Sequence, residues 1–349
     1  DPHEHAGADR LPDDRRTRID TCRPARYEGR SQLVVASARS SQSYEQIQPY
    51  LFAVAYRMTG SATDAEDLVH DAWIRYLDAG SPKVESLRAW LTTAVSRLAL
   101  DHLKSARVRR EAYPGPWLPE PVPTESALAG PEEALEQREE ISMALLTLME
   151  RLTPEQRVVY VLRQGFGLPY DEIAEHVNRS AAACRQIFRR AQQRLAGERK
   201  RTIAPGNEHR KALERFMAAV QSGDVARVAE LMSDDVVWLG DGGPHRRAGR
   251  RPIVGVDRVS RGLVGIARKA RGTMDLRQYF VDLNGAPAMV ITESGRLERV
   301  IDCDVRDGKI TVFRTILNPD KLLHVARVLG LPVVEGDADL PRLAARSSR

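Results

Sequence analysis

Residues 168–201 hold the side-chain types that a nucleic-acid reader needs. A helix expected over Ala181–Leu195 has one apolar face and one face of hydrogen-bond donors. The donor face consists of Arg185, Gln186, Arg189, Arg190, Gln192 and Gln193. Arginine matches guanine edges and phosphates, and glutamine matches adenine. Residues 179–201 contain eight basic residues against Glu198 alone, a net charge of +7 that exceeds the +5 of the whole chain. A solvated surface helix usually mixes both signs, so this pattern favours DNA binding.

A shorter helix expected over residues 170–177 precedes this donor-rich helix. The tight turn Asn178-Arg179-Ser180 separates the two helices. Asn178 tolerates a left-handed backbone, and Ser180 is a favourable N-cap for the second helix. Two helices joined in this way indicate a helix-turn-helix. The predicted DNA-reading residues are Arg179, Ser180, Arg185, Gln186, Arg189 and Arg190.

The helix expected over residues 64–78 has a different chemistry. Its apolar stripe at helical spacing consists of Ala65, Leu68, Val69, Ala72 and Tyr76. The opposite face holds Asp67, His70 and Asp71 with Ile74 among them. Acids in the first turn also suit the helix dipole, but that account leaves an exposed Ile74 unexplained. An acidic face with apolar residues suits a basic protein partner, whereas phosphates repel it. The predicted docking residues are Asp64, Glu66, Asp67, Asp71 and Ile74.

A third helix begins after Ser86 and becomes basic near its end. Lys104, Arg107, Arg109 and Arg110 place four cations within seven residues. Compensation of the helix dipole is one explanation, but this density favours contact with a nucleic-acid backbone.

Groups capable of acid, base or nucleophilic chemistry also occur in the last third of the chain. They are Trp238, Asp241, His245, Asp302 and Cys303. Their spacing dictates no mechanism, and Asp302 is equally well explained as a solvated carboxylate. The three cysteines, Cys22, Cys184 and Cys303, lack zinc-ligand or disulfide spacing, which is typical of a reducing cytoplasm. We expect no enzyme, no catalytic residue, no metal site and no cofactor.

Three regions must position these groups. Helical periodicity covers about residues 44–112 and resumes at about Glu132, and six prolines between residues 113 and 131 indicate a linker. After residue 206, expected helices at Glu208–Gln221 and Val225–Met232 precede β-rich runs. Those runs are Asp235–Leu239, Thr273–Asp282, Ala288–Thr292, Leu297–Val305 and Lys309–Leu317. The expected fold class is therefore multidomain, with two all-α modules followed by an α+β domain.

The length of 349 residues suits two or three domains. The expected divisions are an N-terminal segment (1–43), a helical domain (44–112), a linker (113–135), the helix-turn-helix domain (136–200), the α+β domain (206–330) and a flexible tail (331–349). Residues 1–43 lack apolar periodicity, and we expect them to be disordered or added for expression. No stretch approaches the roughly 18 apolar residues of a membrane-spanning helix, so we expect no membrane association.

The order of these features resembles a bacterial RNA polymerase sigma factor of the extracytoplasmic-function (ECF) type. Asp64–Trp73 looks like region 2.2, which in that family grips the β′ clamp coiled coil of core RNA polymerase. The stretch from Leu87–Leu91 through Asp101–Lys104 looks like regions 2.3 and 2.4, which melt and read the −10 promoter element. Leu152–Arg157 opens a segment similar to domain 4, whose helix-turn-helix reads the −35 element.

This resemblance implies roles for the predicted residues. The acidic docking residues would bind polymerase at the β′ clamp, and domain 4 would contact the β flap. The −10 element would be contacted by Arg97, Lys104, Arg107, Arg109 and Arg110. Arg97 departs from the family, which often has an asparagine there.

The region after residue 206 resembles a SnoaL-like domain of the NTF2 superfamily, a cone of helices against a curved sheet. Three segments are similar to motifs of the sigma subgroup that has this extension: Trp117-Leu118-Pro119-Glu120-Pro121, Asp241-Gly242-Gly243 and Asn318-Pro319-Asp320-Lys321-Leu322. Pro244 and His245 depart from the subgroup pattern. The resemblance implies that the linker touches the domain near the other two motifs. We expect this contact to set the placement of the two sigma domains.

The expected function is that of an alternative sigma factor in the cytoplasm, which binds core RNA polymerase and promoter DNA. The SnoaL-like domain would modulate this activity, and its pocket is a candidate site for an unknown small ligand. The alternative is a one-component DNA-binding regulator whose SnoaL-like domain is a ligand sensor or a small-molecule enzyme. The acidic docking residues discriminate between the two, because such a regulator has no need of a polymerase-docking helix.

Overall fold

The computed structural model describes residues 27–82, 84–128, 135–199, 206–271 and 275–336. The chain divides into two compact units, residues 1–44 and 45–349. The first unit is described only from Tyr27 onwards, where it is helical. No helix among the described residues is both long and apolar enough to cross a membrane.

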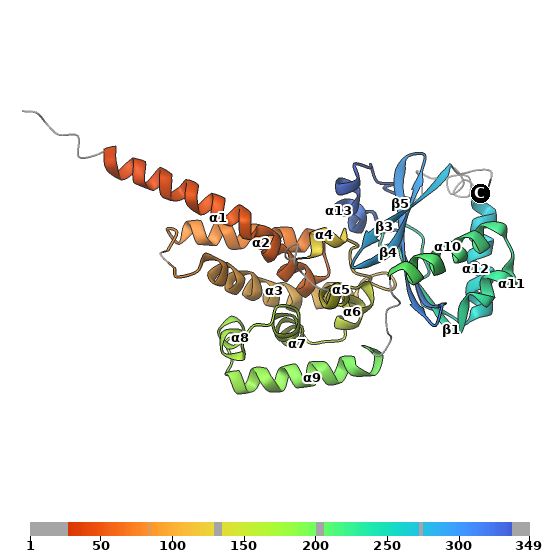
Figure 1. Ribbon diagram of the computed structural model, residues 1–349, viewed down its shortest axis with the longest axis horizontal. Coiled ribbons are helices and arrows are strands. Elements are labelled where there is room, and N and C mark those ends of the chain that lie inside the picture. Colours follow the sequence, from red (N-terminus) through yellow and green to blue (C-terminus); the bar gives the residue numbers. More distant parts are fainter. Residues whose placement is uncertain (1–26, 83, 129–134, 200–205, 272–274, 337–349) are drawn as a thin grey trace, which may run out of the picture. The chain divides into compact units, whose positions relative to one another are not determined.

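The first all-α module consists of α1 (Tyr27–Thr59), α2 (Ala62–Asp78) and α3 (Leu87–Glu111) (Figure 1). α1 begins well before the start expected at Tyr44, so part of the segment expected to be disordered is helical. Residues 1–26 lie outside the described part. The Ser61 hydroxyl caps α2 by accepting a hydrogen bond from the Asp64 amide. The apolar stripe expected on α2 is buried as predicted, with Ala65 and Ala72 fully inaccessible.

The linker contains a short helix, α4 (Thr124–Ala127), and its residues 129–134 lie outside the described part. The second all-α module consists of α5 (Leu135–Glu140), α6 (Met143–Met149), α7 (Pro154–Tyr160), the π-helical turn η1 (Val161–Gly165), α8 (Tyr170–Val177) and α9 (Ala181–Arg199). Asn178 adopts the left-handed conformation with φ 53°, and the Ser180 hydroxyl accepts a hydrogen bond from the Ala183 amide. The predicted turn of the helix-turn-helix is thus confirmed.

The α+β region contains one six-stranded sheet. Its helices are α10 (Gly206–Ser222), α11 (Val225–Glu230), α12 (Val256–Ala270) and α13 (Pro319–Leu329). Its strands are β1 (Met232–Asp241), β2 (Ile253–Val254), β3 (Leu276–Leu283), β4 (Ala286–Glu293), β5 (Arg296–Arg306) and β6 (Lys309–Ile316). The strand order is β2-β1-β6-β5-β4-β3, and β1 and β6 alone pair in parallel among these strands. β2 and α12 were not expected from the sequence.

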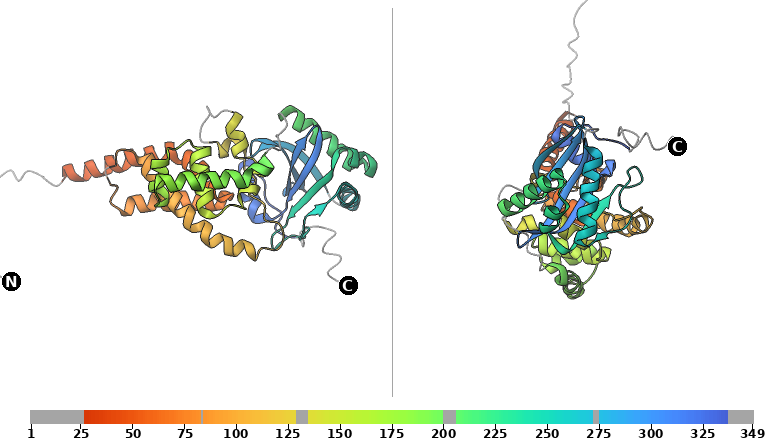
Figure 2. Two further views of the ribbon diagram at one scale, coloured as in Figure 1. Left: turned by 90° about the horizontal axis from the view of Figure 1, so that it is seen from below. Right: turned by 90° about the vertical axis from the view of Figure 1, so that its right-hand side faces the viewer.

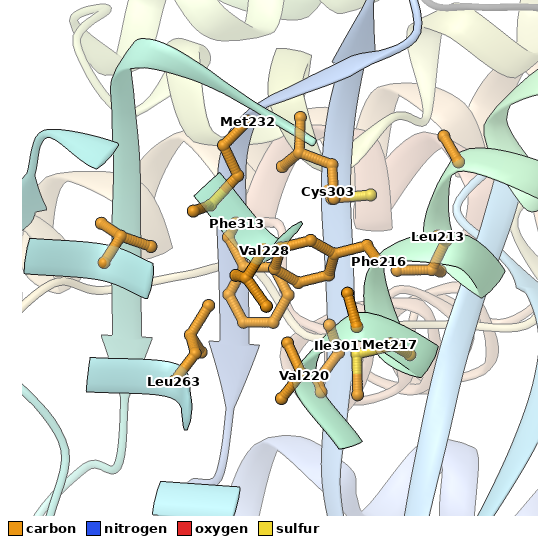
Figure 3. Close-up of a cluster of buried hydrophobic side chains, with 14 of the residues drawn as sticks. Leu213, Phe216, Met217, Val220, Val228, Met232, Leu263, Ile301, Cys303 and Phe313 are labelled. Carbon is orange, nitrogen blue, oxygen red and sulfur yellow. The ribbon is translucent and has the colours of Figure 1, made fainter. Parts of the chain in front are cut away.

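Side chains alternate between two cores because successive strand residues point to opposite faces. Helices α10 and α12 lie against the sheet (Figure 2). Met289 and Ile291 belong to the core between these helices and the sheet. In the same core Phe216 of α10 meets Phe313 of β6 (Figure 3). Ala288 and Val290 belong to the second core, together with Leu322, Val325 and Ala326 of α13. A sheet covered by helices agrees with the α+β domain expected for this part of the chain.

The second core also contains side chains from outside the α+β region. Leu118 of the linker and Met143 of α6 are buried there, 0% and 3% exposed. Residues 331–336, which were expected to be a flexible tail, run beside β5, with Leu297 donating to the Pro332 carbonyl and Val334 donating to the Leu297 carbonyl. Residues 337–349 lie outside the described part. The sheet therefore depends on the rest of the chain for part of its core.

Candidate nucleic-acid, polymerase and linker interfaces

The donor face of α9 is open to solvent. Arg185, Gln186, Arg189 and Arg190 are exposed, while Cys184, Ala191 and Leu195 are buried. Ser180 caps the helix through its hydroxyl. The Arg179 guanidinium is already paired, because its Nη2 donates to Glu155 Oε1 at 2.7 Å. Four of the six predicted DNA-reading residues thus form an exposed surface without an acid.

The acidic docking residues of α2 divide into an open part and a part that is paired within the chain. Asp67 and Asp71 are exposed, and Ile74 is 40% exposed. Asp64 Oδ2 lies 3.1 Å from His102 Nε2 of α3, which lowers the pKa of Asp64 although burial alone would raise it. Asp67, Asp71 and Ile74 thus form the open part.

Glu66 is paired with side chains of the α+β region. Arg327 of α13 donates to both carboxylate oxygens of Glu66 at 3.0 Å, and His324 Nδ1 lies 3.1 Å from Oε1. The His324 ring stacks on Phe52 of α1, with ring centroids 5.6 Å apart, and burial lowers its pKa. A residue predicted to dock to polymerase therefore already has a partner within the chain. Neither Arg327 nor His324 was predicted from the sequence.

The middle of α3 contacts the second all-α module. Arg97 donates to the Glu175 carbonyl at 2.9 Å, and Thr93 Oγ1 lies 2.8 Å from His176 Nδ1. Burial, with a smaller contribution from Arg97, lowers the pKa of His176 to about 4. Lys104 pairs with Asp101 at 3.0 Å, and both are exposed. The side chains predicted at positions 107 and 109 lie outside the described part.

Arg110 differs from its expected role in contacting DNA. Its guanidinium pairs with Glu150, donates to the Thr59 carbonyl at 2.9 Å and lies 3.7 Å from the ring centroid of Trp117. It therefore faces the linker and α6 rather than solvent.

The linker is held by a buried ion pair of the α+β region. Asp241 Oδ2 accepts hydrogen bonds from the Leu118 amide at 2.8 Å and from Lys321 Nζ at 2.7 Å. Lys321 also donates to the Leu118 carbonyl and lies 3.9 Å from the ring centroid of Trp117. Both charged side chains are nearly inaccessible, with 0% and 6% exposure. These contacts join the three motifs as the resemblance implied.

The second oxygen of the same carboxylate binds the start of the linker. Asp241 Oδ1 accepts hydrogen bonds from the Tyr113 hydroxyl at 2.5 Å and the Gly243 amide at 3.2 Å. Asn318 Nδ2 donates to the same hydroxyl at 2.9 Å. Gly243 has φ 56°, and a Cβ there would lie 2.6 Å from the Asn318 side chain, so only glycine fits without strain. Tyr113 was not predicted, because one tyrosine beside prolines has no distinctive pattern.

Glu120 connects the linker to α2. Its carboxylate accepts hydrogen bonds from the Ser61 hydroxyl at 2.6 Å and from the amides of Ala62 and Thr63 at 2.9 and 3.2 Å. The carboxylate thus satisfies free amides at the start of a helix, where the dipole favours negative charge. Burial raises the pKa of Glu120 despite these bonds.

Asn284 is a second contact that sequence reasoning missed. Its Oδ1 accepts from the Val122 amide at 3.0 Å, and its Nδ2 donates to the Tyr56 hydroxyl at 2.6 Å and the Ile141 carbonyl at 2.9 Å. The Asn284-Gly285 pair is a hairpin signal, which predicts the turn but not these distant partners. One side chain thus ties the sheet to α1, the linker and the segment before α6.

The remaining motif residues mostly support this contact. Pro119, Pro121, Gly242, Pro319 and Leu322 are buried. Asp320 is exposed and lies 3.5 Å from His245 Nε2.

The side chains considered for catalysis do not converge on one site. Trp238 Nε1 donates to Thr315, and Cys303 Sγ lies 3.4 Å from His209 Nε2. Burial raises the pKa of Cys303 well above its usual value. Asp302 pairs with Arg314 at 2.7 Å, and burial raises its pKa to about 6. Among the described residues, no group of three or more His, Cys, Asp and Glu side chains could hold a metal ion.

Comparison with known proteins places this arrangement in a family. The family model "Sigma-70 region 2" matches residues 43–109, and "Sigma-70, region 4" matches residues 142–195. The chain is 37% identical over 290 residues to the ECF RNA polymerase sigma factor SigJ of Mycobacterium tuberculosis (strain ATCC 25618 / H37Rv), covering 80% of this chain and 91% of that protein. The chain belongs to the ECF RNA polymerase sigma factors.

Two further comparisons agree with this assignment. The chain is 30% identical to the probable ECF sigma factor SigI of M. tuberculosis (strain CDC 1551 / Oshkosh), over 83% of this chain and 97% of that protein. The crystal structure of M. tuberculosis SigJ superposes with a TM-score of 0.65 and 33% identity, covering 82% of this chain and 98% of that chain. The protein is an alternative sigma factor that directs transcription initiation, and the one-component regulator is not favoured. The first all-α module is sigma-2 and the second is sigma-4.

Proposed function

We propose that the donor face of α9 reads the −35 element and that the open part of the acidic docking residues binds core RNA polymerase. The exposed and acid-free face of Arg185, Gln186, Arg189 and Arg190 is the observation that carries the DNA assignment. Asp67, Asp71 and the exposed Ile74 combine charge with apolar area, as protein interfaces require. The partner surfaces would be the β′ clamp for sigma-2 and the β flap for sigma-4, in the cytoplasm.

We further propose that sigma-2 and sigma-4 separate when the protein engages a promoter. The two elements lie about 25 base pairs apart, which is roughly 85 Å of B-form DNA at about 3.4 Å per base pair. Arg97 and Thr93 of sigma-2 instead contact Glu175 and His176 of sigma-4 directly. These contacts hold α3 against α8 and must break before both elements are read. Among the predicted −10 residues whose side chains the structure describes, Lys104 is exposed and is proposed to contact the −10 element.

The α+β region acts in this proposal as a regulatory domain rather than an enzyme. It binds the linker through Asp241 and Lys321, and it binds the polymerase-docking helix α2 through Arg327. Because core polymerase and α13 would compete for Glu66, the domain restrains core binding. The dispersed positions of the candidate catalytic side chains agree with a role without chemistry.

Reconstituted transcription tests this function. The full chain with core RNA polymerase should initiate specifically at a subset of promoters in a genomic library. Arg189→Ala should lower initiation without lowering core affinity, because its side chain lies on the donor face. Ile74→Ala should lower core affinity itself. Failure of the full chain to support specific initiation, or loss of core binding in Arg189→Ala, would refute the assignment of these surfaces.

A further inference from the structure

The α+β region encloses a cavity that plays no part in the proposed sigma function. It has a volume of about 420 Å³, within the range that holds small ligands, and lies between the sheet and the helices α10 and α12. Figure 3 shows several of its walls, including Met217 and Val220 of α10, Leu263 of α12 and Phe313 of β6. Eleven of its sixteen lining residues are apolar. An occupant would therefore need a mainly apolar body.

The charged side chains among the described lining residues are all positive. Two of them, Arg271 and Arg299, are arginines, and none of the described lining residues is acidic. Arg299 is anchored, because its Nε and Nη2 both donate to the fully buried Glu298. Its third guanidinium nitrogen, Nη1, has no hydrogen-bond partner in the described part of the chain. The Arg299 side chain lines the cavity and is 18% exposed. Nη1 is the guanidinium nitrogen that Glu298 leaves for a ligand.

The carboxylate that anchors Arg299 is shared between two arginines. Glu298 also accepts a hydrogen bond from Arg246 Nη2. Arg299 is therefore not the sole partner of this carboxylate. Gln278 lies in the same cross-strand row as Arg299, with Ile291 between them, since Gln278 pairs with Ile291 and Ile291 pairs with Arg299. A second neutral donor therefore lies two strands away, roughly 10 Å at about 4.8 Å per strand.

The same wall lacks the groups that turnover requires. No Asp, Glu, His, Cys, Lys or Tyr side chain occurs among the described lining residues. The one hydroxyl, that of Thr315, already accepts a hydrogen bond from Trp238 Nε1 at 3.0 Å. General acid–base catalysis needs a titratable group within hydrogen-bond reach of the substrate. The cavity is therefore built to bind and not to convert.

We propose that this cavity binds a small amphiphile that has an apolar body and a single carboxylate, with the carboxylate held by Arg299. An aliphatic body would contact the side chains of α10 and α12, and the carboxylate would accept hydrogen bonds from the Arg299 guanidinium. Charge-assisted hydrogen bonds to guanidinium are stronger than neutral ones, so the anion is preferred over an alcohol of equal length. This inference is independent of promoter recognition.

Calorimetric titration of the full chain with three ten-carbon probes tests this proposal. Decanoate should bind at least about tenfold more tightly than 1-decanol, a difference of about 1.4 kcal/mol. Decyltrimethylammonium should bind more weakly than 1-decanol. Equal binding of decanoate and 1-decanol, or tighter binding of the cation, would overturn the proposal.

Two variants locate the site. Arg299→Gln should weaken decanoate at least tenfold and leave 1-decanol unchanged, whereas Arg277→Gln, on the neighbouring exposed position of β3, should change neither. Ala270→Trp, at the end of α12 on the cavity wall, should fill the cavity and abolish binding of both probes. This variant tests the site even if Arg299→Gln does not fold. Unchanged decanoate binding in Ala270→Trp would place the ligand elsewhere and contradict the assignment.

Discussion

Replacing Asp241 with Asn removes the charge that holds the linker on the α+β region. The carboxylate accepts four hydrogen bonds, from Leu118 and Lys321 on one oxygen and from Tyr113 and Gly243 on the other. Asparagine keeps only one acceptor oxygen, so two buried donors lose their acceptor in either orientation of the amide. Each loss costs about 1–3 kcal/mol, and a buried ion pair broken on one side costs about 3–5 kcal/mol. We expect local opening of the linker to become easier by about 3 kcal/mol, which is more than a hundredfold.

Native-state hydrogen exchange at the Leu118 amide measures this opening directly, because that amide donates to Asp241. Asp320→Asn is a matched control. It makes the same chemical change in the Asn318–Leu322 motif, but on a side chain that is 68% exposed. This control should change the free energy of opening at the Leu118 amide by less than about 0.5 kcal/mol. Adding Lys321→Met to Asp241→Asn should recover part of the loss, because it removes the unpaired buried cation. Unaltered exchange at Leu118 in Asp241→Asn would refute the claim that this carboxylate holds the linker.

Three further changes test other contacts. Burial lowers the pKa of His176 to about 4, so the sigma-2/sigma-4 contact favours the neutral imidazole. The stability that this contact gains is fully present above about pH 6.5 and is progressively lost as the pH falls towards 4. Lowering the pH from 7 to 5 should therefore weaken the sigma-2/sigma-4 contact by about 2 kcal/mol, seen as a longer spin-label distance between α3 and α8; a pH-independent distance contradicts this. Glu120→Gln should lower the free energy of unfolding by about 1–2 kcal/mol in denaturant titrations, because one oxygen no longer accepts from α2; an unchanged midpoint and slope argue against it. Gly243→Ala should lower that free energy by more than about 1 kcal/mol, since its Cβ would collide with Asn318 at a positive φ; wild-type stability would show that the turn relaxes.

The helix-turn-helix could be predicted because its signals are local. Asn178 and Ser180 act within one turn of the chain, and the donor face of α9 follows from helical spacing alone. The apolar stripe and exposed Ile74 of α2 were predictable for the same reason. In contrast, α12 was missed although its buried residues Val259, Leu263 and Val264 recur at helical spacing.

Contacts between distant segments could not be predicted in this way. Arg327 lies 261 positions from Glu66, and no local pattern distinguishes it from another basic residue near a helix end. Arg110 illustrates the same problem, because a run of cations has the same sequence pattern whether it faces phosphates or Glu150 and Trp117. The linker contact could be anticipated only through resemblance, and its partner Tyr113 was missed.

The restraint of sigma-2 by the α+β region is tested most directly by the affinity of the full chain for core RNA polymerase in the variant Arg327→Glu. The Arg327–Glu66 pair is 62% and 37% exposed, so solvent screening limits its contribution to about 1 kcal/mol, and charge reversal adds repulsion of similar size. We expect core polymerase to bind Arg327→Glu up to about thirtyfold more tightly than wild type, while Arg258→Glu on the exposed side of α12 leaves the affinity unchanged. Equal or weaker binding of Arg327→Glu would contradict competition between α13 and polymerase for Glu66.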